Sequence, residues 1–138
     1  GIRSWLSFAC LHNLIEPISL DVRAKWPSTQ YDLIFTSNSL HIMDDDAAEA
    51  CIKGAAICLK PGGFFITYGP FNYNGAFTSE SNRQFEGWLK QNNPHSGIKH
   101  FETLNEIAVQ SALTLQKDVE MPANNRILIW QRETLADN

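Results

Sequence analysis

Side chains that could bind and orient a small ligand follow two apolar runs of the sequence. The first run, residues 31–36, is followed by an amide, a hydroxyl and an imidazole, and the second, residues 64–68, ends in a phenol. An imidazole with an ordinary pKa of about 6.5 can take up a proton from a reacting group. We therefore single out His41 and Tyr68 as candidates to receive a proton. A histidine packed in the core or exposed at the surface is an equally good interpretation of His41, and this alternative stays open.

The hydrophobic pattern predicts strands that alternate with helices. Strands are predicted over residues 18–22, 31–36, 64–68, 113–121 and 126–131. Helices are predicted over residues 2–13 and 44–59, and from about residues 79 and 103 onward. Because residues 33–35 are apolar without a break, we expect that strand to be parallel and buried on both faces. Only residues 122–125 separate the last two strands, which predicts an antiparallel hairpin.

Together these elements predict an α/β protein with a mostly parallel sheet, a C-terminal antiparallel hairpin and helices on its faces. Ligands of such open sheets bind beyond the carboxyl ends of the strands, so we expect the site directly after residues 22, 37 and 68. The loop over residues 68–77 is rich in aromatic and amide side chains. This composition fits a pocket lid and also a loop that packs on the sheet edge, and the predicted place of the loop at the carboxyl end of a strand favours the lid.

Five short runs carry a resemblance to a known family. The runs are Asn38-Ser-Leu-His-Ile-Met43, Leu59-Lys-Pro-Gly-Gly-Phe64, Tyr68-Gly-Pro-Phe-Asn72, Phe77-Thr-Ser-Glu-Ser-Asn82 and Met121-Pro-Ala-Asn-Asn125. With them, the sequence resembles the second half of a class I S-adenosylmethionine-dependent methyltransferase, of the domain-of-unknown-function 938 group. The resemblance covers residues 1 to about 132.

The resemblance implies a Rossmann-like sheet, S-adenosylmethionine as the cofactor and a role for each group of candidate residues. The residues expected to bind the cofactor are Asp21 and Val22 against the adenine, and Asn38, Ser39 and Leu40 with His41 at the methionine and sulfonium end. The residues expected on the substrate side are Pro70, Phe71, Asn72, Asn124 and Asn125. Residue types alone leave open a helix cap or solvated acid for Asp21, and an ordinary hairpin turn for Asn124 and Asn125.

One part of the family's pattern is missing from the sequence. These methyltransferases begin with a strand and a glycine-rich turn that cradles the cofactor, and no G-x-G turn occurs in the 138 residues. In the family's strand order, the first two strands lie between those that correspond to residues 18–22 and 31–36. We therefore expect residues 1–138 to form a single, partial methyltransferase domain that is incomplete at its N-terminus.

The leading functional hypothesis is S-adenosylmethionine-dependent methyl transfer to a small-molecule or other acceptor. Methyl transfer from a sulfonium needs mainly the orientation of two bound reactants, so positioning residues suffice. The alternative is a non-catalytic, truncated methyltransferase-like module that acts as a binding or dimerisation scaffold. A homodimer stays open as its partner.

Composition argues against several other classes of protein. A net charge of -4 disfavours a nucleic-acid binder, and no run approaches the roughly 20 apolar residues of a membrane-spanning helix. Three cysteines and the lack of an Asn-x-Ser/Thr site favour a cytoplasmic protein. Cys51 and Cys58 lie on the apolar stripe of a predicted helix, and residues 44–46 begin that helix, so we expect no metal site.

Overall fold

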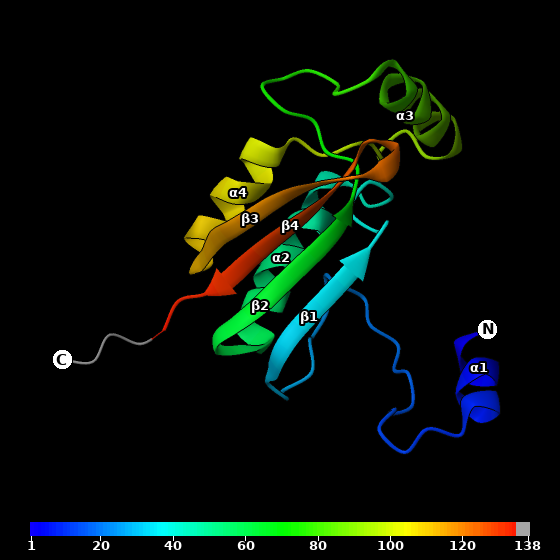
Figure 1. The fold of residues 1–138 in the computed structure, drawn as a ribbon, viewed down its shortest axis with the longest axis vertical. Coiled ribbons are helices and arrows are strands. Elements are labelled where there is room, and N and C mark those ends of the chain that lie inside the picture. The colour runs from blue at the N-terminus through cyan, green and yellow to red at the C-terminus, as the bar shows by residue number, and fades with distance from the viewer. Residues whose placement is uncertain (135–138) are drawn as a thin grey trace.

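The computed structural model describes residues 1–134 as helices arranged around one sheet (Figure 1). The elements are α1 (Ile2–Ala9), β1 (Tyr31–Ser37), α2 (Asp45–Cys58), β2 (Leu59–Gly69), α3 (Glu80–Asn92), α4 (Phe101–Gln110), β3 (Leu113–Met121), a short 3₁₀ turn (Pro122–Asn124) and β4 (Asn125–Arg132). None of the helices within residues 1–134 is both long and apolar enough to cross a lipid bilayer.

The sheet has the strand order β1-β2-β4-β3. β1 pairs with β2 in parallel, whereas β4 is antiparallel to both β2 and β3. The predicted α/β class and the C-terminal hairpin are therefore confirmed, and β4 lies beside β2 as the family resemblance implied. Within residues 1–134 the sheet is mixed rather than mostly parallel, because only one of its pairings is parallel.

Helices α2 and α4 cover one face of the sheet and form the core with it (Figure 1). Alternate residues of β2 and β4 point toward these helices, and Phe65 and Trp130 are fully buried with their rings stacked 6.0 Å apart. The indole nitrogen of Trp130 donates a hydrogen bond to the Asn105 side chain on α4 at 3.0 Å. The Trp130 ring is thus packed against a second ring, and its indole nitrogen has a hydrogen-bond partner.

The opposite face of the sheet is exposed among the described residues. Leu33 and Phe35 on β1 are 51% and 56% exposed, while Ile34 between them packs against the core. The prediction that β1 is buried on both faces is wrong for residues 1–134, because α2 and α4 lie on the same side. Figure 1 shows α1 lying apart from the sheet rather than over it.

The predicted strand over residues 18–22 is also wrong. These residues are irregular and largely exposed, and no described strand lies next to them. A strand needs a neighbour to accept its backbone hydrogen bonds, so an extended run without one has no reason to become regular. The first helix also ends earlier than predicted, at Ala9 instead of near Asn13. The next residue, Cys10, takes the left-handed conformation with φ 50°.

Candidate functional site

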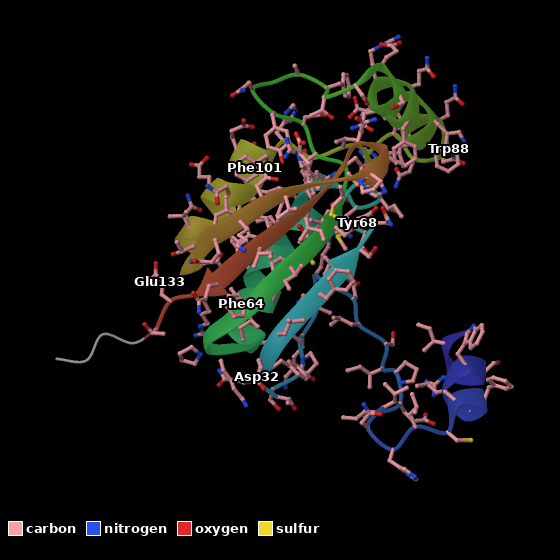
Figure 2. The ribbon with its side chains drawn as sticks, in the orientation of Figure 1. Asp32, Phe64, Tyr68, Trp88, Phe101 and Glu133 are labelled. Atoms are coloured by element: carbon pink, nitrogen blue, oxygen red, sulfur yellow. The ribbon has the colours of Figure 1, made fainter. Side chains whose placement is uncertain are left out.

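The carboxyl ends of β1 and β2 meet the turn before β4 at one edge of the sheet. The backbone N–H of Asn38 donates to the Tyr68 carbonyl at 2.8 Å. On the other side, the Asn125 amide donates to the Tyr68 hydroxyl at 3.2 Å. Figure 2 shows Tyr68 at this end of β2, with Phe64 farther back along the same strand. Three residues predicted for the site from separate parts of the sequence therefore lie together.

Gly69, the last residue of β2, is buried against the turn that follows β1. A Cβ atom built on Gly69 would lie 3.6 Å from Nδ1 of His41 and 4.0 Å from Oδ1 of Asn38. Asn38 itself has φ 53°, a left-handed conformation that asparagine tolerates better than most residues. The turn after β1 thus directs an amide and an imidazole toward a point where the backbone of β2 carries no side chain.

His41 is held in a buried position by α3 and by the segment before α4. It is 5% exposed, and its ring packs edge-on against Phe85 with the ring centres 5.4 Å apart. Burial lowers the pKa of His41, and the nearby Lys99 ammonium lowers it further. His41 is therefore neutral near pH 7, the form in which an imidazole can accept a proton.

The buried Lys99 ammonium is satisfied by backbone oxygens rather than by a ligand. Its Nζ donates to the carbonyls of Met43 at 2.7 Å and of Gly97 at 2.9 Å, with Asp45 at 3.7 Å. These bonds join the turn after β1 to the segment before α4. Lys99 consequently acts on the site through its charge on His41 and through this connection.

Asp21 and Val22 lie on a segment that is anchored to the start of α2. Val22 packs against the core, and its carbonyl accepts a hydrogen bond from the Trp26 indole at 2.9 Å. Arg23 pairs with Asp44, the residue that caps α2 by accepting from the Ala47 N–H at 2.8 Å. The Asp21 carboxylate is exposed and accepts from the Arg23 N–H at 3.0 Å, which matches the solvated acid that residue type alone had left open.

Several predicted contact residues lie with their side chains inside the protein. Leu40 and Phe71 belong to the core cluster, and Asn72 is 3% exposed. The backbone of Asn72 pairs with the segment before α4, since its N–H donates to Lys99 and its carbonyl accepts from Phe101. Ser39 makes a local bond to the Ser37 carbonyl at 3.0 Å. A ligand at the surface could not contact the side chains of Phe71 and Asn72 directly. The structure therefore gives no support to their predicted roles in substrate binding.

Pro70, Asn124 and Asn125 line a surface pocket of about 370 Å³ at the same edge of the sheet. The other lining residues are Ser81, Asn82 and Phe85 from the start of α3, and Ala123 from the hairpin turn. Helix α3 lies beyond the carboxyl ends of β1 and β2, next to that turn (Figure 1). Sequence reasoning gave these α3 residues no role, although the run over residues 77–82 was among those that carried the family resemblance.

A larger cavity of about 830 Å³ lies between the start of α2, α3 and the segment before α4. Its lining is strongly charged, with residues Asp44, Asp45, Asp46, Glu86, Lys90 and Lys99. Within residues 1–134, no three histidine, cysteine or acidic side chains are grouped as ligands for a metal ion. The two cavities thus differ sharply in charge.

Comparison with known proteins identifies the family. A family model described as "Protein of unknown function (DUF938)" matches residues 1–132. The chain belongs to the DUF938 family. A curated relative, the mRNA cap guanine-N(7) methyltransferase of Drosophila melanogaster, is 40% identical over 68 residues, which is 48% of this chain and 15% of that protein.

Solved structures of methyltransferases share the fold. An O-methyltransferase family protein from Burkholderia thailandensis matches 98% of this chain and 41% of its own, with a TM-score of 0.80 and 20% identity. A mitomycin 7-O-methyltransferase matches 94% of this chain and 38% of its own, with a TM-score of 0.78 and 18% identity. DUF938 membership and these likenesses confirm the class I methyltransferase-like fold. The chain spans less than half the length of each of these three proteins.

Proposed function

We propose that this protein takes part in S-adenosylmethionine-dependent methyl transfer to a small-molecule acceptor. The observation that carries the proposal is the carboxyl edge of β1 and β2, where Asn38 and His41 lie against Gly69 and the Asn38 N–H bonds to the Tyr68 carbonyl. This edge lies beyond the carboxyl ends of parallel strands, where open α/β sheets bind their ligands. The methyltransferase-like fold adds the class of reaction.

The described residues fit one side of the cofactor. The cofactor supplies a methyl group on a positively charged sulfur. Asn38 is exposed at the carboxyl end of β1, so its amide can bond the polar groups of the cofactor. Val22 packs against the core, and the neighbouring Arg23 ties this segment to Asp44 at the start of α2. The sequence contains no glycine-rich turn for the remaining side.

The chain's own residues would orient the acceptor and receive its proton. His41 is neutral and buried, so its ring nitrogen can take the proton that an acceptor oxygen or nitrogen loses. The Tyr68 hydroxyl accepts from Asn125, which fixes its direction at the edge of the sheet. Orientation of two reactants can lower a reaction barrier by roughly 7–11 kcal/mol, so methyl transfer needs few groups beyond those that position the reactants.

Calorimetric titration with S-adenosylmethionine tests the proposal. We expect micromolar affinity for the wild-type chain and a loss of at least tenfold for Asn38→Gly, which removes the amide but tolerates the left-handed backbone. Asn74→Gly is the matched control, because Asn74 has the same φ of 53° in a different turn, which the backbone bonds between Tyr73 and Ala76 close. Absence of heat at millimolar cofactor, or equal losses in both variants, would overturn the proposal.

A second candidate function is a non-catalytic module that binds a second copy of the chain. It is favoured by the exposed apolar face of β1 and by the outer edge of that strand, which pairs with no other strand of residues 1–134. Both can pair with an identical surface. Sedimentation velocity separates the two candidates. A stable dimer that binds no cofactor supports the scaffold. A chain that stays monomeric at about 100 μM, a concentration on the order of the dissociation constant of a weak dimer, rejects it.

A further inference from the structure

The pocket of about 370 Å³ between α3 and the hairpin turn has an uncharged lining. Its volume lies within the roughly 300–1,000 Å³ of small-molecule sites. Pro70, Phe85 and Ala123 provide apolar walls, and the polar groups are one hydroxyl and three amides, from Ser81, Asn82, Asn124 and Asn125. An ion placed here would lose hydration without meeting an opposite charge, so the lining favours a neutral ligand.

The amide nitrogens of the pocket are already used within the protein. Asn82 Nδ2 donates to the Thr78 hydroxyl at 3.0 Å and to the Asn124 carbonyl at 3.4 Å. Asn124 Nδ2 donates to the Ser81 hydroxyl at 3.3 Å, and Asn125 Nδ2 donates to the Tyr68 hydroxyl at 3.2 Å. These bonds connect α3, the hairpin turn and β2, and they fix which way each amide points.

The amide oxygens remain free as acceptors. Among the hydrogen bonds within residues 1–134, none ends on Oδ1 of Asn82, Asn124 or Asn125. Asn82 is 5% exposed and lines the pocket, and its Oδ1 is not among the buried side-chain atoms of residues 1–134 that lack a partner, so this oxygen still meets solvent. A ligand that donates a hydrogen to it would take the place of water there.

The Phe85 ring gives the pocket a flat wall whose orientation is fixed. Trp88 stacks on Phe85 at 5.9 Å with 13° between the ring planes, and His41 packs against it edge-on. A flat, unsaturated ligand would stack against such a wall better than a branched aliphatic one. Phe85 also places the pocket next to His41, the candidate to receive the acceptor's proton.

We infer that this pocket binds the methyl acceptor, and that the acceptor is an uncharged, flat molecule that donates a hydroxyl or amino hydrogen to the Asn82 oxygen. That the ligand is a methyl acceptor rests on the proposed function, whereas its binding chemistry follows from the pocket alone. Ser81, Asn82 and Phe85 are then specificity-determining residues.

Titration of the ¹⁵N-labelled chain with three matched probes tests the inference by NMR. The probes are 2-naphthol, its methyl ether 2-methoxynaphthalene and the anion 2-naphthoate. We expect 2-naphthol to shift the backbone signals of Ser81, Asn82 and Asn125 and to bind at least tenfold more tightly than either other probe. Equal binding of the ether overturns the hydrogen-donor requirement, and tighter binding of the anion overturns the neutral class.

Variants on α3 identify the atoms responsible. Asn82→Ala should weaken 2-naphthol binding at least tenfold and bring its affinity close to that of the ether. Gln91→Ala is the matched control, because Gln91 is an exposed amide on the same helix. Phe85→Leu keeps the apolar volume and removes the flat wall, so it decides the question if Asn82→Ala does not fold. Unchanged binding in both pocket variants overturns the inference.

The cofactor titration is carried out on the same samples, so that the two failures can be told apart. Cofactor binding without 2-naphthol shifts at the pocket overturns this inference and leaves the proposed function standing. Binding of 2-naphthol without cofactor binding overturns the proposed function, and with it the acceptor role of the pocket.

Discussion

Replacing Gly54 with alanine tests how the segment that carries Asp21 and Val22 is held. Gly54 lies in the buried part of α2, and a Cβ atom built on it overlaps the Trp26 indole at Cε2 and Nε1 and lies only 2.5 Å from Cδ2. The same indole donates to the Val22 carbonyl. The ring therefore fits over α2 only because residue 54 has no side chain.

Two effects of opposite sign set the expected magnitude. Alanine in place of glycine in a helix interior stabilises by about 1 kcal/mol. Normal carbon–carbon contact is about 3.5–4.0 Å, so the indole must move by at least about 1 Å, and overpacking of this kind costs roughly 1–3 kcal/mol. Loss of the bond to Val22 adds about 1 kcal/mol. We expect Gly54→Ala to lower the free energy of unfolding by about 1–3 kcal/mol.

Urea denaturation followed by far-ultraviolet circular dichroism measures this change, and a double-mutant cycle isolates its cause. In a Trp26→Ala background the clash is absent, so Gly54→Ala should stabilise by about 1 kcal/mol and the effect reverses in sign. Cofactor affinity should fall in Gly54→Ala if the anchored segment contributes to binding. Stabilisation by Gly54→Ala in the wild-type chain would refute the reasoning.

Three further predictions concern single buried groups. Asn105→Ala leaves the buried Trp130 N–H without its partner and should cost about 1–3 kcal/mol in urea denaturation, whereas a loss below 0.5 kcal/mol would contradict that bond. The pKa of His41, measured by NMR, should lie below 6.5. The free energy of unfolding should therefore decrease as the pH falls from about 6.5, the pKa in the unfolded chain, through the lower pKa in the folded protein. A pKa above 6.5 would contradict its burial. Burial raises the pKa of Cys51 to about 11, so iodoacetamide at pH 8 should label exposed Cys10 and spare Cys51, and equal labelling would contradict this.

The strands of the sheet and the hairpin were predictable because their evidence is local. Residues 64–68 and 126–131 carry β-rich apolar patterns, and the short linker over residues 122–125 allows only an antiparallel return. The structure confirms both strands and the antiparallel return. Ala123 and Asn124 have φ values near +60°, so the turn interpretation holds for Asn124, whereas Asn125 is extended with φ -92°. Local pattern also located Asn38 and Tyr68 correctly at strand ends.

Features that depend on a neighbour could not be predicted from the same patterns. Residues 18–22 have strand-forming side chains, but no described strand lies beside them and the segment stays irregular. Residues 33–35 have the composition of a strand covered twice, yet α2 and α4 both pack on one side. Phe71 resembles a loop aromatic in sequence and is 2% exposed in the structure, because the loop folds back over α4 and Tyr73 stacks on Phe101.

The candidate site divides along the same line. One side of the site is formed by the ends of the strands, which the local sequence pattern predicts. The other side is formed by α3, whose position depends on a few contacts between segments that are far apart in the sequence. Asn82 reaches the hairpin turn and Phe85 meets His41, and both contacts also shape the pocket. A displacement of α3 would therefore open the pocket and expose His41 to water at the same time. Because exposure would relieve the burial that lowers its pKa, a rise in the His41 pKa in Phe85→Leu would report that displacement directly.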